Sequence, residues 1–162
     1  MRPTADLPID PDVDLRKPRQ RIGRRRAPWA TLAVISAGGV LGACSRHALG
    51  LAWPHRPDQF PWATLLINVS GCLLIGVLMV LISEVWSAHR LLRPFLGVGI
   101  LGGYTTFSTY TTDVQQLVAA GAARTALLYL GGTLIAALAA VYVGVTTTRA
   151  MTGVSARRKE KR

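Results

Sequence analysis

Residues 97–113, GVGILGGYTTFSTYTTD, carry side chains suited to contact with a small anion. Phe107 and Tyr110 lie three residues apart, so on a helix both rings share one face and present their partially positive edges. Nearby hydroxyl groups can donate hydrogen bonds to the same ion, and they belong to Thr105, Thr106, Ser108 and Thr109. The stretch indicates an uncharged anion path, although core aromatics beside a helix kink are the commoner explanation of such a pattern.

The same stretch predicts an interrupted helix. Two consecutive glycines, Gly102 and Gly103, weaken a helix, and the β-branched residues Thr105 and Thr106 weaken it further. An interruption leaves backbone carbonyl oxygens without their helical donors, which is tolerated at membrane depth only where protein, ion or water satisfies them. Such oxygens are suitable ligands for a hard cation such as Na⁺.

Two further polar residues stand inside apolar runs, where hydrocarbon makes them costly. Arg46 is either a structural anchor that extends toward the interface or, less favoured, an anion ligand. Asn68 lies six residues into its run and either bonds to another helix or donates from its amide to an anion in a water-filled path. The residues alone leave both alternatives for Asn68 open.

Four apolar runs, residues 29–53, 62–83, 91–120 and 125–148, are available to position these groups. Each reaches the roughly 20 residues that a helix needs to cross a bilayer. Half of the 162 residues are hydrophobic, 17% are charged, and the mean hydropathy is +0.32. The predicted fold is therefore an all-α integral membrane protein with four transmembrane helices over residues 29–148, the third broken mid-membrane. Residues 1–28 are predicted to be a disordered basic tail, and residues 149–162 a second basic tail.

The charges are distributed unevenly around these runs. Sixteen of the nineteen Lys and Arg residues lie in the two tails or near the connection between the second and third runs. Basic clusters beside membrane spans face the cytoplasm and its anionic lipid. We therefore expect a multi-pass protein of the cell membrane with both termini in the cytoplasm. Lipid explains the net charge of +11 better than nucleic acid does, and no nucleic-acid partner is expected.

Three segments together resemble the Fluc (CrcB) family of fluoride channels. They are GGVLGACSR at 38–46, ATLLINVSG at 63–71 and GGYTTFSTY at 102–110. The resemblance implies passive exit of cytoplasmic fluoride through pores in an antiparallel dimer with a structural Na⁺ at its centre. It assigns the Na⁺ to the carbonyl oxygens of Gly102 and Thr105 from both subunits, and the pore to Asn68, Phe107 and Tyr110. It places Arg46 near a vestibule or in helix packing. Tyr129 and Thr133 continue a weaker polar track.

The sequence departs from the family pattern at several positions. Ala63 replaces a glycine, Tyr110 replaces a phenylalanine, and His47 stands where an aromatic residue is usual. The charge bias is a further departure, because an antiparallel homodimer requires one sequence to insert in both orientations. It suggests the hypothesis that this chain pairs with an oppositely oriented paralogue, while a homodimer stays possible.

Other functions fit the residues less well. A small multidrug-type transporter, also dimeric with four helices, requires a carboxylate in the first span, where this chain has Arg46. A non-conducting assembly subunit of a heterodimeric channel stays open because of Tyr110. No nucleophile, carboxylate pair or histidine cluster is placed for catalysis, so an enzyme is not expected. Asp113 and Glu84, near the ends of their spans, are interpreted as solvated or capping groups.

Overall fold

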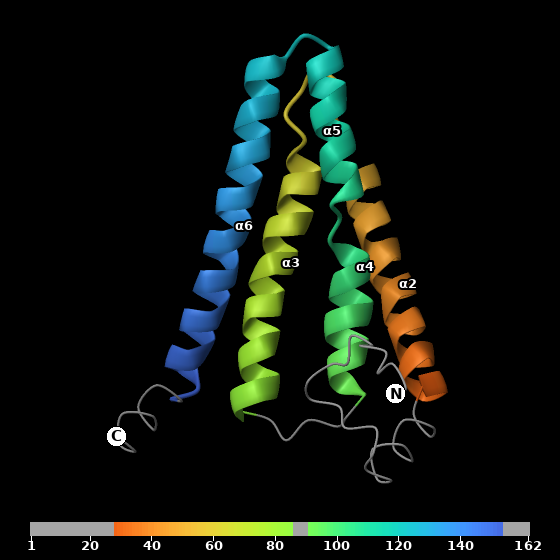
Figure 1. Cartoon of the computed structure of the whole chain (residues 1–162), viewed down its shortest axis with the longest axis vertical. Coiled ribbons are helices and arrows are strands. Elements are labelled where there is room, and N and C mark those ends of the chain that lie inside the picture. Colours follow the sequence, from red (N-terminus) through yellow and green to blue (C-terminus); the bar gives the residue numbers. More distant parts are fainter. Residues whose placement is uncertain (1–27, 86–90, 154–162) are drawn as a thin grey trace, which may run out of the picture.

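The computed structural model describes residues 28–85 and 91–153, and every element within them is helical. Residues 1–27 of the predicted N-terminal tail and residues 154–162 of the predicted C-terminal tail lie outside the described residues. So does most of the connection between the second and third apolar runs. The helices stand side by side along one long axis (Figure 1).

Three of the described helices are long and apolar enough to cross a membrane. They are α2 (Pro28–Ala52), α3 (Trp62–Val80) with its π-helical continuation η1 (Leu81–Val85), and α6 (Ala123–Met151). Their bounds lie within a few residues of three of the predicted spans. α6 begins two residues before its predicted start and continues to Met151, so the first residues assigned to the C-terminal tail are helical.

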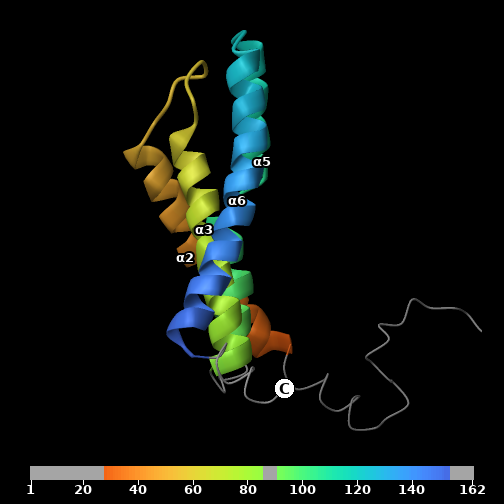
Figure 2. The same ribbon diagram turned by 90° about the vertical axis from the view of Figure 1, so that its left-hand side faces the viewer.

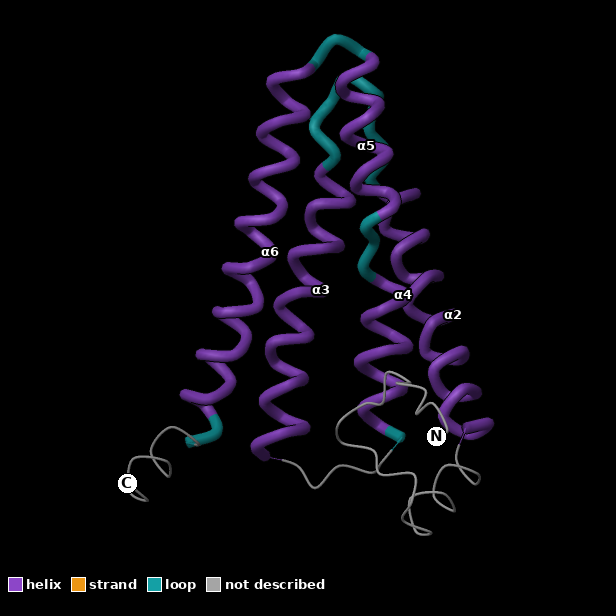
Figure 3. The backbone as a smooth tube through the Cα atoms, in the orientation of Figure 1, coloured by secondary structure: helices purple, strands orange, loops and turns teal. Residues whose placement is uncertain are grey.

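The remaining segment is helical but interrupted. It consists of the π-helix η2 (Pro94–Leu101), the short α4 (Gly102–Tyr104) and α5 (Ser108–Ala119). Thr105 leaves the helix with φ −73° and ψ 156°, which is extended backbone. The predicted interruption is present and appears as a loop between α4 and α5 in Figure 3. It follows the two glycines instead of including them, because β-branched threonines accept the extended conformation readily.

The two halves of this segment pack against different helices. η2 and α4 lie along α2, whereas α5 lies along α6 (Figures 1 and 2). A Cβ atom added to Gly42 of α2 would collide with the Ile100 carbonyl group, so backbones meet there directly. α3 packs along α6 in the same way, since a Cβ atom on Gly76 would collide with the Val141 carbonyl group. Small residues allow membrane helices to approach this closely.

The best-buried cluster lies near the turn between α5 and α6. Leu117, Ala126 and Tyr129 form its centre, each no more than 2% exposed. Phe60, from the connection between α2 and α3, packs its ring edge-on against Tyr129, with centroids 5.3 Å apart. The cluster therefore holds α5, α6 and the connection between α2 and α3 in fixed positions relative to the helix break.

Candidate anion site at the helix break

Asn68 holds the interrupted backbone at Thr106. Its amide nitrogen donates to the Thr106 carbonyl oxygen at 2.9 Å, and its amide oxygen accepts from the Thr106 N–H at 2.9 Å. The side chain thus satisfies both backbone groups of one residue outside a helix, which a buried break requires. Of the two alternatives that the sequence left open, a bond to another segment is formed, at the break and not on a helix, and one amide N–H is left over.

Thr106 in turn bonds to the first turn of α5. Its hydroxyl oxygen accepts a hydrogen bond from the Thr109 N–H at 3.1 Å, and its hydroxyl group donates to the Thr109 hydroxyl oxygen at 3.0 Å. The Thr106 N–H, bonded to Asn68, and the Thr109 N–H, bonded to Thr106, are therefore not available to backbone carbonyl groups. In a continuous helix the Thr106 N–H would bond to Gly102, and the Thr109 N–H would bond to Thr105. The carbonyl oxygens of Gly102 and Thr105, the predicted Na⁺ ligands, have therefore lost their helical donors.

Arg46 reaches the same break from α2. Its Nε atom donates to the carbonyl oxygen of Gly103 at 3.1 Å, and the side chain is half-buried. A third carbonyl group freed by the break is satisfied in this way. The contact supports the favoured interpretation of Arg46 as a structural anchor.

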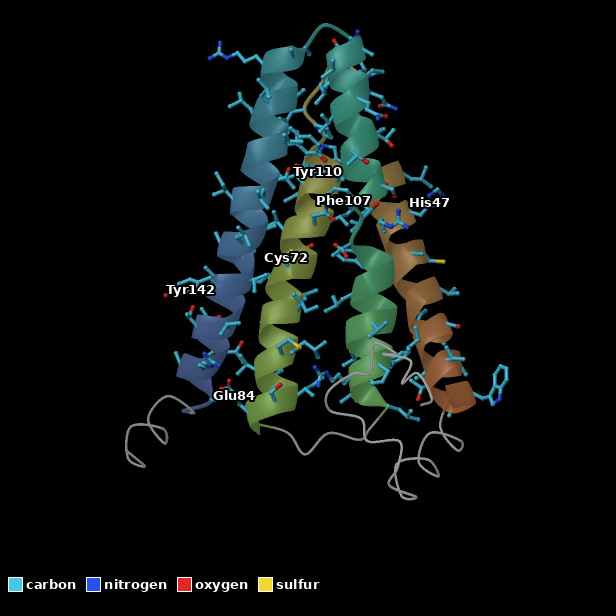
Figure 4. The ribbon with its side chains drawn as sticks, viewed as in Figure 1. His47, Cys72, Glu84, Phe107, Tyr110 and Tyr142 are labelled. Atoms are coloured by element: carbon cyan, nitrogen blue, oxygen red, sulfur yellow. The ribbon has the colours of Figure 1, made fainter. Side chains whose placement is uncertain are left out.

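A cavity of about 590 Å³ lies between α3, the break and α6. Its wall includes four predicted site residues, Asn68, Thr106, Phe107 and Tyr110, as well as the predicted cation ligands Gly102 and Thr105. The rings of Phe107 and Tyr110 are 5.8 Å apart between centroids and tilted by 47° (Figure 4). The Tyr110 hydroxyl donates to the Leu130 carbonyl oxygen of α6 at 2.7 Å. The hydroxyl group that distinguishes Tyr110 from the phenylalanine of the family pattern is thus bonded to a residue of the cavity wall.

Thr133 of α6 also lines this cavity. It is 5% exposed, and within the described residues its hydroxyl oxygen has no hydrogen-bond partner. A buried polar group without a partner is costly, so the position is suited to a polar ligand or water in the cavity.

The two other predicted hydroxyl groups lie elsewhere. Thr109 lines a second cavity of about 300 Å³, between α2, α3 and α5, which Thr106 and Arg46 also line. Ser108 lines neither cavity; it is exposed, and its hydroxyl lies 3.3 Å from that of Thr106. The structure thus brings Thr109 and Ser108 to the break but not to the large cavity.

Asp113 corrects the sequence-based interpretation. It is 5% exposed, accepts a hydrogen bond from the Tyr129 hydroxyl at 3.2 Å, and lies 3.7 Å from Nε2 of His55. It is not solvated, because α5 continues beyond it and the α2–α3 connection covers it. Two signals were available: an acid within an apolar run, and its position three residues after Tyr110 on one helix face. Glu84, the other acid, forms a two-pronged ion pair with Arg149 of α6.

Comparison with known proteins agrees with this geometry. The family model described as CrcB-like protein, Camphor Resistance (CrcB), matches residues 32–145, which include all three sequence motifs. The chain belongs to the CrcB family. It is accordingly a multi-pass membrane protein, and its family consists of channels and not enzymes.

Three curated relatives in the CrcB family illustrate the match. "Fluoride-specific ion channel FluC 2" of Nocardia farcinica is 53% identical over 128 residues, covering 79% of this chain and 91% of that protein. The protein of the same name from Streptomyces avermitilis is 51% identical over 129 residues, covering 77% and 79%. That from Thermobifida fusca is 46% identical over 132 residues, covering 82% and 98%.

Proposed function

We propose that this chain forms a fluoride-selective channel through which cytoplasmic fluoride leaves the cell passively. The observation that carries the proposal is the helix break held open by Asn68 at the wall of a cavity lined by Phe107 and Tyr110. The names of the CrcB relatives, fluoride-specific ion channels over most of the chain, support it.

The cavity offers hydrogen-bond donors to an anion without a charged side chain that would hold it too tightly. The remaining N–H of Asn68, the Thr133 hydroxyl and the ring edges of Phe107 and Tyr110 replace part of the hydration shell of the ion. None of the residues lining this cavity is a Lys, Arg or His. Binding is therefore strong enough to admit a dehydrated anion and weak enough to release it. A small ion fits short hydrogen bonds, so chloride is excluded.

In the proposed topology the interrupted segment also crosses the membrane. It is third in chain order and brings the number of crossings to four. Its break needs internal partners at membrane depth, and Asn68 and Arg46 supply them. Both termini then lie on one side, and the basic residues concentrated there favour the cytoplasm.

The channel is further proposed to be an antiparallel dimer. Phe107, although central to the candidate path, is 76% exposed in the single chain, which supports a second subunit completing the wall. The carbonyl oxygens of Gly102 and Thr105 would hold Na⁺, since their helical donors bond elsewhere. The ion would supply positive charge that these oxygens need at membrane depth. The charge bias favours an oppositely oriented paralogue as the partner, with the homodimer as the alternative.

The decisive experiment is reconstitution of the purified chain alone in liposomes, with fluoride efflux followed by an ion-selective electrode. Rapid release of fluoride but not of chloride is expected if the chain forms a homodimer. Release only after co-expression with a paralogue would establish the heterodimer. Absence of release in both preparations would reject the channel and leave the non-conducting assembly subunit. Cysteine labelling of the connections from each side tests orientation, and equal labelling would contradict a single topology.

The multidrug-type alternative gains no support from the site. The described part of the first helix contains no carboxylate, and its one cation is bonded to the Gly103 carbonyl oxygen.

A further inference from the structure

Two histidines line the second cavity together with Arg46. His47 follows Arg46 on α2 and is exposed, and His55 lies on the connection that leads to α3, with a side chain 23% exposed. This cavity shares Thr106 with the large one. Figure 4 places His47 on the α2 side of the break, away from Tyr110. One permanent cation and two imidazole groups therefore stand next to the candidate anion path.

The charged and titratable neighbours of these imidazoles come from α2, α5, α6 and the connection between α2 and α3. His55 faces Asp113 of α5 at 3.7 Å, and the Tyr129 hydroxyl of α6 donates to the same carboxylate. On its own connection the neighbouring charges, Arg56 and Asp58, form an exposed ion pair at 3.2 Å. His47 has Arg46 beside it on α2, and Arg46 is bonded through Nε to the Gly103 carbonyl oxygen.

Protonation of His47 and His55 makes the net charge in and around this cavity more positive. Histidine is the side chain whose charge ordinarily changes between pH 5 and 8. A protonated His55 offsets the negative charge of Asp113, which lies three residues beyond Tyr110. A protonated His47 adds to the positive charge of Arg46. A cleft lined by charges of one sign concentrates the opposite ion and raises its rate of capture.

We propose that protonation of His47 and His55 raises the anion affinity of the Arg46 cavity, so that acidification speeds fluoride flux through this chain. The ligand class is a small inorganic anion, captured before it reaches the wall of the large cavity. This inference rests on the proposed channel function.

The first test measures fluoride efflux from vesicles containing the full chain, with equal pH on both sides. The quantity compared is the ratio of rates at pH ~6 and pH ~7.5, after subtraction of efflux from protein-free vesicles. The wild type should show a rise of roughly fivefold on acidification. The double variant His47→Gln, His55→Gln should lose most of that rise. His89→Gln, which removes the remaining histidine of the chain, is the matched control and should keep it. An equal ratio in the wild type and the double variant overturns the inference.

The second test does not depend on flux, so it separates failure of this inference from failure of the proposed function. Fluoride binding to the purified chain in detergent is measured at pH ~6 and pH ~7.5, for the wild type and for the double variant. Anion and proton binding are reciprocal, so the wild type should bind fluoride roughly threefold more tightly at the lower pH, and the double variant should show no such difference. Equal affinities of the wild type at the two pH values overturn the inference even if the chain alone does not conduct.

Discussion

The two halves of the interrupted segment are held in different ways. Below the break, η2 and α4 meet α2 through glycines, so that backbone lies against backbone. Above it, α5 meets α6 through side chains, with the Tyr110 hydroxyl on a carbonyl oxygen and the Tyr129 hydroxyl on Asp113. The first contact has no room for added atoms, while the second depends on polar groups finding partners. Because of the break, the first half of the segment packs against α2 through backbone contacts and the second half packs against α6 through side chains.

The largest effect on stability is expected where backbones meet. Gly42→Ala places a methyl group against the Ile100 carbonyl group and should lower the free energy of unfolding by about 2 kcal/mol. Gly39→Ala, on the same helix, places its methyl group in open space and should be neutral or stabilising by up to ~1 kcal/mol. Unfolding of the purified chain by SDS titration measures both. Equal stability of the two variants would show that the lower half is not packed as described.

The next effect concerns the break that separates the halves. Asn68→Leu removes both partners of the Thr106 backbone and should reduce fluoride efflux by about 100-fold, since buried backbone groups are left unpaired. Ser70→Ala removes a contact of the same helix with the Tyr104 hydroxyl and leaves Thr106 untouched. It should change efflux by less than about threefold, a loss smaller than one ordinary hydrogen bond. Wild-type fluoride efflux through the Asn68→Leu variant would show that conduction does not depend on the bonds between Asn68 and the break.

A smaller effect is expected from the polar pair above the break. Tyr129→Phe and Asp113→Ala should each lower the free energy of unfolding by about 1–2 kcal/mol, because each leaves a buried group short of a partner. The double variant should cost less than the sum, with a coupling of about 1 kcal/mol. Thr146→Val removes a hydroxyl bonded only within α6 and is the control, expected within ~0.5 kcal/mol. Additive losses would mean that the two side chains do not interact.

The smallest effect tests the departure from the family pattern. Tyr110→Phe keeps the ring edge and loses the bond to the Leu130 carbonyl oxygen, at a cost of about 1 kcal/mol in stability. Fluoride efflux should stay within about twofold, because the lost hydroxyl belongs to helix packing and not to the ion path. Tyr142→Phe, on an exposed ring of α6, is the control for stability. A large gain or loss of efflux would place the Tyr110 hydroxyl in the path.

Local physics explains what the sequence predicted well. Helix length and apolar composition define α2, α3 and α6, and the Gly and Thr propensities around Gly102 and Thr106 define the interruption. Each of these properties belongs to neighbouring residues. The positions of Asn68, Phe107 and Tyr110 on one cavity wall follow from the same local order together with the family resemblance.

Long-range contacts explain what the sequence did not reveal. The change of partner from α2 to α6 depends on packing of surfaces that are distant in the chain. Asp113 was misinterpreted because its burial comes from Tyr129, sixteen residues later, and from the connection that carries His55. The roles of Ser108 and Thr109 depended on which side of the break each hydroxyl faces, which no spacing rule fixes once the helix is interrupted.

The shortness of the helices in the interrupted segment bears on how the protein is made. Only α2, α3 with η1, and α6 have the length and hydropathy of self-sufficient membrane helices among those described. In the four-crossing arrangement proposed above, the remaining segment enters the bilayer with help from helices synthesised before it. The glycine contacts of α2 and the amide of Asn68 are already available at that moment. An insertion assay on Asn68→Leu would detect this dependence as poorer integration of residues 94–119. Integration by the translocon and assembly of the ion path would then be one event.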